Sequence, residues 1–152
     1  MDRRQLIQMT AEEQQAFLDG EKTVTLCTID SHGYPHAVAM WFCLIDGMAH
    51  MTTFRKSQKV VNLRRNPKLA LLAESGTAYS ELCGLMIRGC GEIVDDIDLC
   101  IDVLSKIHVR YGGENDPSLR DALRAQASKR VVLRIHPDRT SSWNHSKLAG
   151  AY

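Results

Sequence analysis

Residues 52–68 concentrate positive charge beside hydroxyl groups. Six basic residues and no acidic one occupy positions 55–68: Arg55, Lys56, Lys59, Arg64, Arg65 and Lys68. The chain has 19 Lys and Arg and 18 Asp and Glu, so 13 basic residues remain against 18 acidic ones elsewhere, a net charge of −5. The positive charge is therefore local, and the chain lacks the overall basicity of a polyanion-binding protein.

A helix is expected to begin just after Ser57, because serine is a favoured N-cap residue and an apolar stripe over residues 60–63 follows it. Asn66-Pro67 is expected to end this helix, since proline pushes the preceding residue out of the helical region. The first amides of such a helix have no partner within the helix and lie at the positive end of its dipole.

Several donors converge at this helix start. They are Thr52, Thr53, Arg55, Lys56, Ser57 and Lys59. They come from a strand end, a turn and a helix N-terminus, an arrangement typical of phosphate sites. Cations near a helix start are unfavourable unless an anion is present, so Lys56 and Lys59 favour a ligand. Arg64, Arg65 and Lys68 lie at or beyond the helix end, where the dipole alone accounts for them.

The sequence shows no motif for other kinds of site. It contains no GxGxxG, GxxxxGK[ST], HExxH or GxSxG. His50 alternates with apolar residues, which is typical of a hydrogen-bonded core or interface histidine rather than a metal ligand. No DNA- or RNA-binding motif is present and the pI is about 7.7, so nucleic acid is not an expected partner. The remaining candidate ligand is a phosphorylated cofactor that carries out the chemistry itself.

Hydrophobic periodicity predicts the elements that position these residues. Strands are expected over 22–29, 36–45, 48–54, 68–75, 82–96 and 130–137, and helices over 9–20, 57–66, 96–111 and 116–129, the last opening at Asp116 and Pro117. Gly89 and Gly91 indicate a bend, a bulge or a close backbone approach. Several strands are apolar on both faces, so the expected fold is mainly β: a small closed barrel with flanking helices.

The length of 152 residues fits one compact domain over residues 1–152. Five cysteines, an odd number without a CxxC pair, lie mostly in apolar runs and indicate buried thiols rather than disulfides or a zinc site. The N-terminus has no apolar signal region, and no stretch reaches about 18 apolar residues. We therefore expect a cytoplasmic protein without membrane association.

Three motifs together resemble the pyridoxamine 5′-phosphate oxidase-like superfamily. They are the G-x-P turn within TVTLCTIDSHGYPHAVAMWF, a strand ending in Thr-Thr, and K-x-x-N-L-R-R-N-P before an apolar strand. With the closing SSWNHSKLAGAY, the chain is similar to the flavin and deazaflavin oxidoreductases of that superfamily. The resemblance implies a six-stranded antiparallel Greek-key split β-barrel with flanking helices. It also implies a homodimer that binds FMN or the deazaflavin coenzyme (F420 type) in grooves between the two barrels.

The resemblance implies three groups of cofactor-binding residues at matching positions. They are Thr53, Lys56, Ser57 and Lys59 at the phosphate, Val38, Met40 and Trp41 along the ring system, and Trp143, Asn144 and His145 in a tail that reaches the ring or substrate pocket of its own or of the partner subunit. The alternative for both tryptophans is packing in the core or dimer interface. The ending WNHSKLAGAY does not resemble that of pyridoxamine phosphate oxidase itself, so vitamin B6 oxidation is not expected.

The implied reaction is hydride transfer between the ring and a small organic substrate, which does not strictly require an acid or base from the protein. No general base is predicted, although His36 and His145 could lie near the ring. Two alternatives stay open: a barrel that carries flavin, deazaflavin or haem without turnover, and an interaction domain whose basic helix start meets an acidic partner. The deazaflavin coenzyme has a longer tail than FMN. A positive groove extended by Arg55 and Lys56 would hold this tail, which favours the deazaflavin coenzyme over FMN.

Overall fold

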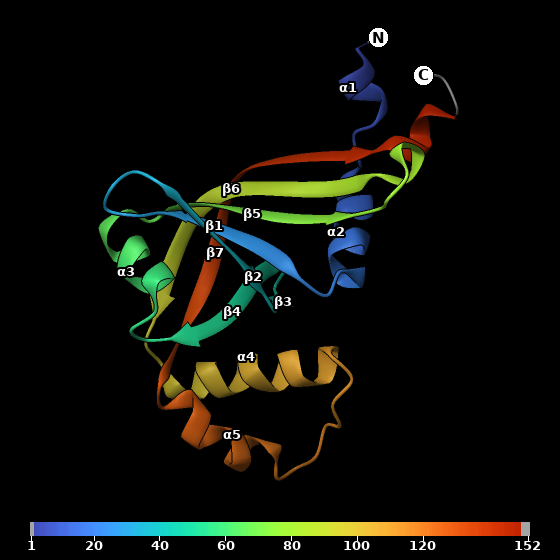
Figure 1. Ribbon diagram of the computed structural model, residues 1–152. Coiled ribbons are helices and arrows are strands. Elements are labelled where there is room, and N and C mark those ends of the chain that lie inside the picture. Colours follow the sequence, from blue (N-terminus) through green and yellow to red (C-terminus); the bar gives the residue numbers. More distant parts are fainter. Residues whose placement is uncertain (1, 150–152) are drawn as a thin grey trace.

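Figure 1 shows the computed structural model, which describes residues 2–149. Within this range seven antiparallel strands form one sheet in the order β2-β1-β5-β6-β7-β4-β3. The strands are β1 (Val24–Ile29), β2 (Pro35–Met40), β3 (Cys43–Ile45), β4 (Met48–Phe54), β5 (Lys68–Ser75), β6 (Cys83–Val94) and β7 (Arg130–Asn144). The expected mainly β class with flanking helices is confirmed, but the expected number of six strands is wrong.

The number differs because the expected single strand over residues 36–45 is two strands, β2 and β3, separated by Trp41 and Phe42. These two strands are the opposite edges of the sheet. Only three peptide units join Met40 to Cys43, so their Cα atoms lie at most about 11 Å apart. The sheet must therefore curl until its edges approach each other at this link, which is the geometry of a split barrel.

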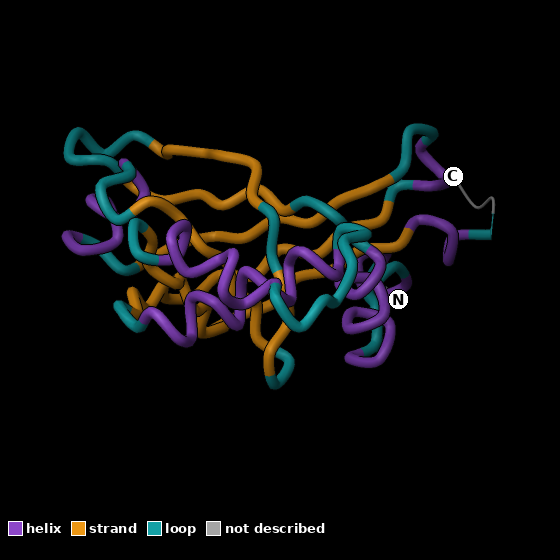
Figure 2. The backbone as a smooth tube through the Cα atoms, turned by 90° about the horizontal axis from the view of Figure 1, so that it is seen from below, coloured by secondary structure: helices purple, strands orange, loops and turns teal. Residues whose placement is uncertain are grey.

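Five helices and two short 3₁₀ turns flank the sheet in the described part of the chain. They are α1 (Arg3–Leu6), α2 (Ala11–Gly20), α3 (Gln58–Arg65), α4 (Ile97–Arg110), α5 (Leu119–Ala127), η1 (Tyr79–Glu81) and η2 (His145–Leu148). Helix α4 packs on β3, β4 and β7, and α5 packs on α4, whereas α3 packs on β1 and β6. Figures 1 and 2 show α4 and α5 together on one side of the sheet. Both described chain ends lie at the end of β6 and β7 that is remote from α3.

Local sequence signals placed most helix ends correctly. Thr10 and Glu13 form the full capping box of α2, and Asn66 is the C-cap of α3. Helix α5, in contrast, begins at Leu119 rather than at Pro117, because the Asp116 carboxylate accepts from the Ser118 amide over 2.7 Å in a turn before the helix. The final strand was predicted too short, because β7 continues to Asn144 and pairs with β6 between Val132 and Asn144.

Apolar side chains form two cores, one on each face of β4. The barrel interior contains the fully buried Leu26, Met51 and Leu133, and the space beneath α4 contains Ile101 and Val132. Because successive side chains of a strand alternate between faces, neighbouring residues of β4 serve different compartments. This alternation separates the two threonines at the end of β4.

The glycine signal in β6 marks a β-bulge, as expected. The register between β6 and β7 shifts between Arg88 and Gly89, and a Cβ on Gly89 would lie 2.0 Å from the backbone oxygen of His136. Only glycine allows this approach without a shift of one strand.

All five cysteines are free thiols, and Cys43 and Cys100 are buried. Cys90 is exposed, contrary to the expectation of a core thiol. Residues 2–149 contain no helix with the length and apolar character needed to cross a membrane.

Candidate functional site

The end of β4 and the start of α3 bring three predicted residues into contact. Ser57 is the N-cap residue of α3, yet its side chain makes no capping hydrogen bond. The Thr53 hydroxyl instead donates to Ser57 Oγ over 3.1 Å and accepts from Lys59 Nζ over 3.1 Å. We call Thr53, Ser57 and Lys59 the anion cluster. Among the described residues the amides of Gln58 and Lys59 have no acceptor, so they are available to an anion.

The electrostatics of the anion cluster favour a negative ligand. Burial lowers the pKa of Lys59 below its usual value, and the positive charge of nearby Arg130 lowers this pKa further. No carboxylate within residues 2–149 forms an ion pair with Lys59. Burial and a like charge both disfavour the charged amine, whereas a bound anion stabilises it.

Three other predicted donors lie outside the anion cluster. Arg55 forms an ion pair with Asp95 and donates to two backbone carbonyls near the start of β7, so its charge is already compensated. Lys56 is exposed and has no protein partner in the described part of the chain. Thr52 lies on the opposite face of β4 from the anion cluster and accepts from Arg130 Nη1 over 3.4 Å.

A pocket of about 420 Å³ lies beside this end of the sheet, and we call it the α4 pocket. Its lining comprises Ala39, Met40, Trp41 and Thr52, then Leu104, Ile107, His108, Leu123 and Gln126 from α4 and α5, and Arg130 from β7. Mostly apolar walls with a few polar groups, at this volume, are typical of a small-molecule site. Thr52 therefore belongs to this pocket rather than to the anion cluster.

Trp41 forms an aromatic wall of the α4 pocket. Its ring stacks on Tyr111 with 4.2 Å between ring centroids and an interplanar angle of 12°, and 58% of the residue remains exposed. The Tyr111 hydroxyl donates to the Lys22 carbonyl and accepts from the Phe42 amide over 3.3 Å, which fixes the stack. The Trp41 ring is thus held on one side and accessible to a planar ligand elsewhere.

The other two predicted ring contacts lie mainly on the inner face of β2. Val38 and Met40 pack against the core of the barrel, and of the two only Met40 also lines the α4 pocket. The outward side chains of this strand are Pro35, Ala37 and Ala39, which are exposed. The structure therefore brings Met40 and Trp41 to the pocket and leaves Val38 in the core.

The predicted tail residues lie at the opposite end of the molecule from the anion cluster. Trp143 is on β7, thirteen residues beyond Arg130, which corresponds to roughly 40 Å along an extended strand. Figure 1 accordingly shows η2 and α3 at opposite ends of the sheet. Trp143 and His145 line a separate cavity of about 590 Å³ near α1 and α2, and the Asn144 amide donates to the Ile7 carbonyl over 2.7 Å. One chain alone does not bring the tail to the anion cluster.

The three histidines considered in the sequence differ in whether their ring nitrogens have hydrogen-bond partners. His50 is buried, with Nδ1 2.9 Å from the Met48 carbonyl and Nε2 3.2 Å from Arg134 Nε, so the expectation of a hydrogen-bonded core histidine is confirmed. His145 Nδ1 lies 2.9 Å from the Tyr79 carbonyl, at the tail end. His36 Nδ1 is buried and has no hydrogen-bond partner in the part of the chain that the structure describes. Neither His36 nor His145 lines the α4 pocket.

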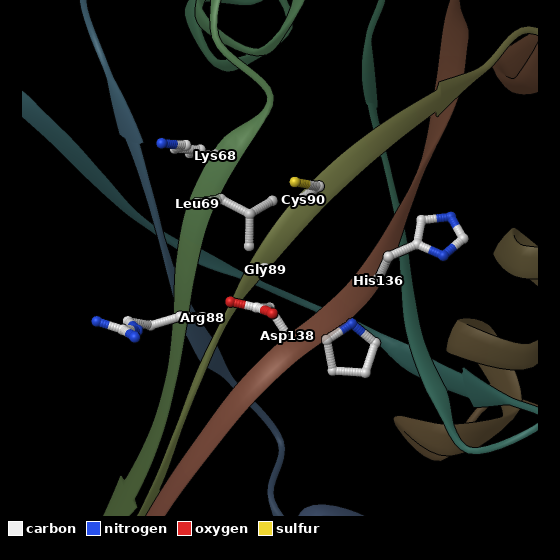
Figure 3. Close-up of a pocket in the computed structure, with 8 residues that line it drawn as sticks. Lys68, Leu69, Arg88, Gly89, Cys90, His136 and Asp138 are labelled. Carbon is white, nitrogen blue, oxygen red and sulfur yellow. The ribbon is translucent and has the colours of Figure 1, made fainter.

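Figure 3 shows another hollow, of about 560 Å³, beside the Gly89 bulge where β5, β6 and β7 meet. Lys68, Arg88, Cys90 and His136 are among its lining residues. It contains none of the predicted cofactor-binding residues, so cavity size alone does not locate the site. No group of His, Cys, Asp and Glu within residues 2–149 is arranged to hold a metal ion.

Two residues of the site were missed by sequence reasoning, Arg130 and Tyr111. Arg130 reaches the pocket because β7 pairs with β4, where Arg130 lies opposite Phe54. Tyr111 was expected at the end of the helix over 96–111, and nothing in its local sequence indicates a stack with Trp41. Arg130 was expected at the start of a strand, where a charged residue gives no signal of a pocket.

The fold is a split barrel in which a helix start with a partly buried lysine lies beside a mostly apolar pocket. The family model described as Pyridoxamine 5′-phosphate oxidase matches residues 10–144. The chain therefore belongs to the pyridoxamine 5′-phosphate oxidase family, in the split-barrel superfamily expected from its motifs.

Solved structures agree with this assignment. The conserved hypothetical protein Rv2991 from Mycobacterium tuberculosis is 38% identical, with 98% of this chain and 93% of that chain covered and a TM-score of 0.92. An F420 reductase is 26% identical, with coverages of 84% and 94% and a TM-score of 0.66. The heme storage protein HutZ from Vibrio cholerae is 18% identical, with coverages of 90% and 97% and a TM-score of 0.68, and shows the fold alone. No curated protein matches the chain.

Proposed function

We propose that this protein is an oxidoreductase that binds a phosphorylated flavin or deazaflavin cofactor and acts on a small organic substrate. The anion cluster would hold the cofactor phosphate, and the α4 pocket would receive the ring beside Trp41. The cofactor supplies hydride transfer, and the chain's own residues bind, orient and shield it. The observation that carries this proposal is Lys59, a partly buried cation without a carboxylate partner, hydrogen-bonded at a helix start with open amides.

Of the two cofactors, the deazaflavin coenzyme is the preferred proposal. The similarity to a protein named as an F420 reductase supports it. The exposed Lys56 is free to meet the longer anionic tail of this coenzyme, whereas Arg55 is occupied by Asp95. FMN shares the first phosphate and remains the alternative.

A homodimer is part of the proposal. The outward face of β2 exposes Pro35, Ala37 and Ala39, which are small apolar residues, and of these Ala39 also lines the α4 pocket. An exposed apolar edge strand typically marks an interface. Because Trp143 and the anion cluster lie far apart in one chain, only a partner subunit would bring the tail to the cofactor.

The test is a spectroscopic titration of the purified protein with the deazaflavin coenzyme and, separately, with FMN, combined with light scattering. We expect saturable binding of one cofactor per chain in a particle of two chains. Binding of haem in their place would favour a carrier function, for which the fold of the heme storage protein HutZ gives a precedent. If none of the three binds, the oxidoreductase proposal falls.

Cofactor binding is expected to weaken at alkaline pH. A bound phosphate raises the pKa of Lys59, while burial and Arg130 lower this pKa in the free protein. Affinity is therefore full below the free-protein pKa and falls as the pH rises through it, because binding then requires proton uptake. The measurement is the dissociation constant from about pH 7 to 10, the range below the usual Lys pKa. The phosphate-free cofactor serves as reference for ionisation of the ring.

The variant Lys59→Arg is the control for this pH dependence. Arginine stays protonated throughout the range, so the alkaline decline should disappear. A decline of the same size in Lys59→Arg would show that another group titrates.

A further inference from the structure

Arg130, the first residue of β7, is held between the anion cluster and the α4 pocket. Its guanidinium carbon lies 4.4 Å from the centroid of the Phe54 ring, and its Nη1 donates to Thr52 Oγ1 over 3.4 Å. Its side chain lines the α4 pocket. The Phe54 ring therefore fixes the guanidinium by a cation–π contact next to the expected ring position.

The hydrogen-bonding capacity of this guanidinium is mostly unused by the protein. Arginine carries five N–H donors, and within residues 2–149 the Arg130 side chain makes only the long contact to Thr52. Its Nε is buried and finds no acceptor among the described residues. Asp95, a carboxylate near this strand end, is engaged by Arg55. Partly buried cations with unpaired donors are costly, and in folded proteins they normally have a partner.

Arg130 and Lys59 serve different parts of one elongated site. Lys59 contacts Thr53, which faces the barrel interior, whereas Arg130 contacts Thr52 on the α4 side of β4. Lys59 does not line the α4 pocket, and Arg130 does. A ligand with its phosphate at Lys59 and its ring in the pocket would therefore present the ring edge to Arg130.

We propose that Arg130 is a specificity-determining residue that binds an electron-rich edge of the ring, with carbonyl oxygens or an anionic nitrogen, and does not bind the phosphate. This inference rests on the proposed function. A guanidinium forms charge-assisted hydrogen bonds with such an edge, and its charge favours the form of the ring that carries more negative charge. The pocket thus selects planar rings with acceptors on one edge over purely hydrocarbon ones.

The test compares two ligands on three variants. The ligands are the cofactor that the wild-type protein binds and its phosphate-free counterpart, riboflavin for FMN or the corresponding deazaflavin chromophore. The variants are Arg130→Gln, Arg130→Lys and the matched control Arg88→Gln. Arg88 is an exposed arginine that lies beside the Gly89 bulge, outside the proposed site (Figure 3).

We expect Arg130→Gln to weaken both ligands by a similar factor of at least about tenfold, the range for a charge-assisted hydrogen bond. Arg130→Lys should lose less, because it keeps the charge without the planar fork. Arg88→Gln should bind both ligands like the wild type. The midpoint reduction potential of the bound cofactor should fall in Arg130→Gln, since a positive charge near the ring stabilises its reduced form.

Other outcomes overturn the inference. Loss of affinity for the phosphorylated ligand alone would assign Arg130 to the phosphate, and unchanged affinity for both would remove it from the site. If Arg130→Gln does not fold, an unchanged affinity for both ligands in Arg130→Lys, which lacks the planar fork, has the same meaning. If the wild-type protein binds neither cofactor, the proposed function and this inference fall together, which is distinct from failure in the variants alone.

Discussion

Replacement of Lys59 by alanine is expected to weaken cofactor binding at least about tenfold while the fold stays intact. A charge-assisted hydrogen bond to phosphate contributes at least about 1.5 kcal/mol, and tenfold in affinity corresponds to about 1.4 kcal/mol. Lys59 is the cation of the anion cluster and lies in the first turn of α3. Fluorescence titration of wild type and variant measures the effect, and circular dichroism checks the fold.

Arg64→Ala is the matched control for Lys59→Ala. It removes one positive charge from the same helix, but in the last turn, where Arg64 is exposed. We expect wild-type affinity for this variant. If both variants lose affinity equally, the effect comes from general charge rather than from the anion cluster. Full affinity in Lys59→Ala would remove the phosphate from this helix start.

Replacement of Phe42 by alanine is expected to lower the free energy of unfolding by about 3–5 kcal/mol, the usual cost of removing a buried phenyl ring. Phe42 is fully buried in the barrel core, and its ring lies 4.5 Å from the guanidinium carbon of Arg110. It belongs to the two-residue link that joins the edges of the sheet. Urea unfolding of both proteins measures the loss.

Phe42→Leu tests whether the effect comes from the filled volume. Leucine keeps much of the apolar side chain, so the loss should be clearly smaller than in Phe42→Ala. The Phe42 amide donates to the Tyr111 hydroxyl, so a shift of the link in Phe42→Ala should also disturb the Trp41 stack on Tyr111 and change the tryptophan fluorescence. A loss below about 1 kcal/mol in Phe42→Ala would contradict the view that this link closes the barrel.

Sequence reasoning succeeded where the signal is local. The helix start at Ser57, the helix end at Asn66 and the bulge at Gly89 each depend on a few neighbouring residues, and each is present. The break between β2 and β3 was missed because Trp41 and Phe42 have high strand propensity and neither glycine nor proline marks the break. The predicted apolar stripe over residues 60–63 is also only partly correct, because Val61 is exposed.

The length of β7 was missed for a physical reason as well. Pro137 was read as the end of the strand, since proline has no amide for the ladder. In the structure Pro137 lies opposite Gly89 at the irregular register, where a missing donor is tolerated, and the strand continues to Asn144. Residues 138–144 are therefore part of the sheet.

Sequence reasoning could predict only the part of the candidate site whose residues are close together in the sequence. Thr53, Ser57 and Lys59 lie within seven positions of one another, so a strand end followed by a helix start brings them together. Arg130 and Tyr111 reach the site through the pairing of β7 with β4 and the packing of α4, which no local pattern encodes. The pairing of β7 with β6 also carries Trp143 away from the anion cluster.

The most direct measurement is the ratio of two dissociation constants in the wild-type protein, one for the cofactor and one for its phosphate-free counterpart. If the anion cluster holds the phosphate, the phosphorylated ligand should bind at least about tenfold more tightly, by the same charge-assisted hydrogen bonding that Lys59→Ala removes. The ratio should approach one in that variant. Equal affinities for the two ligands in the wild type would contradict the account.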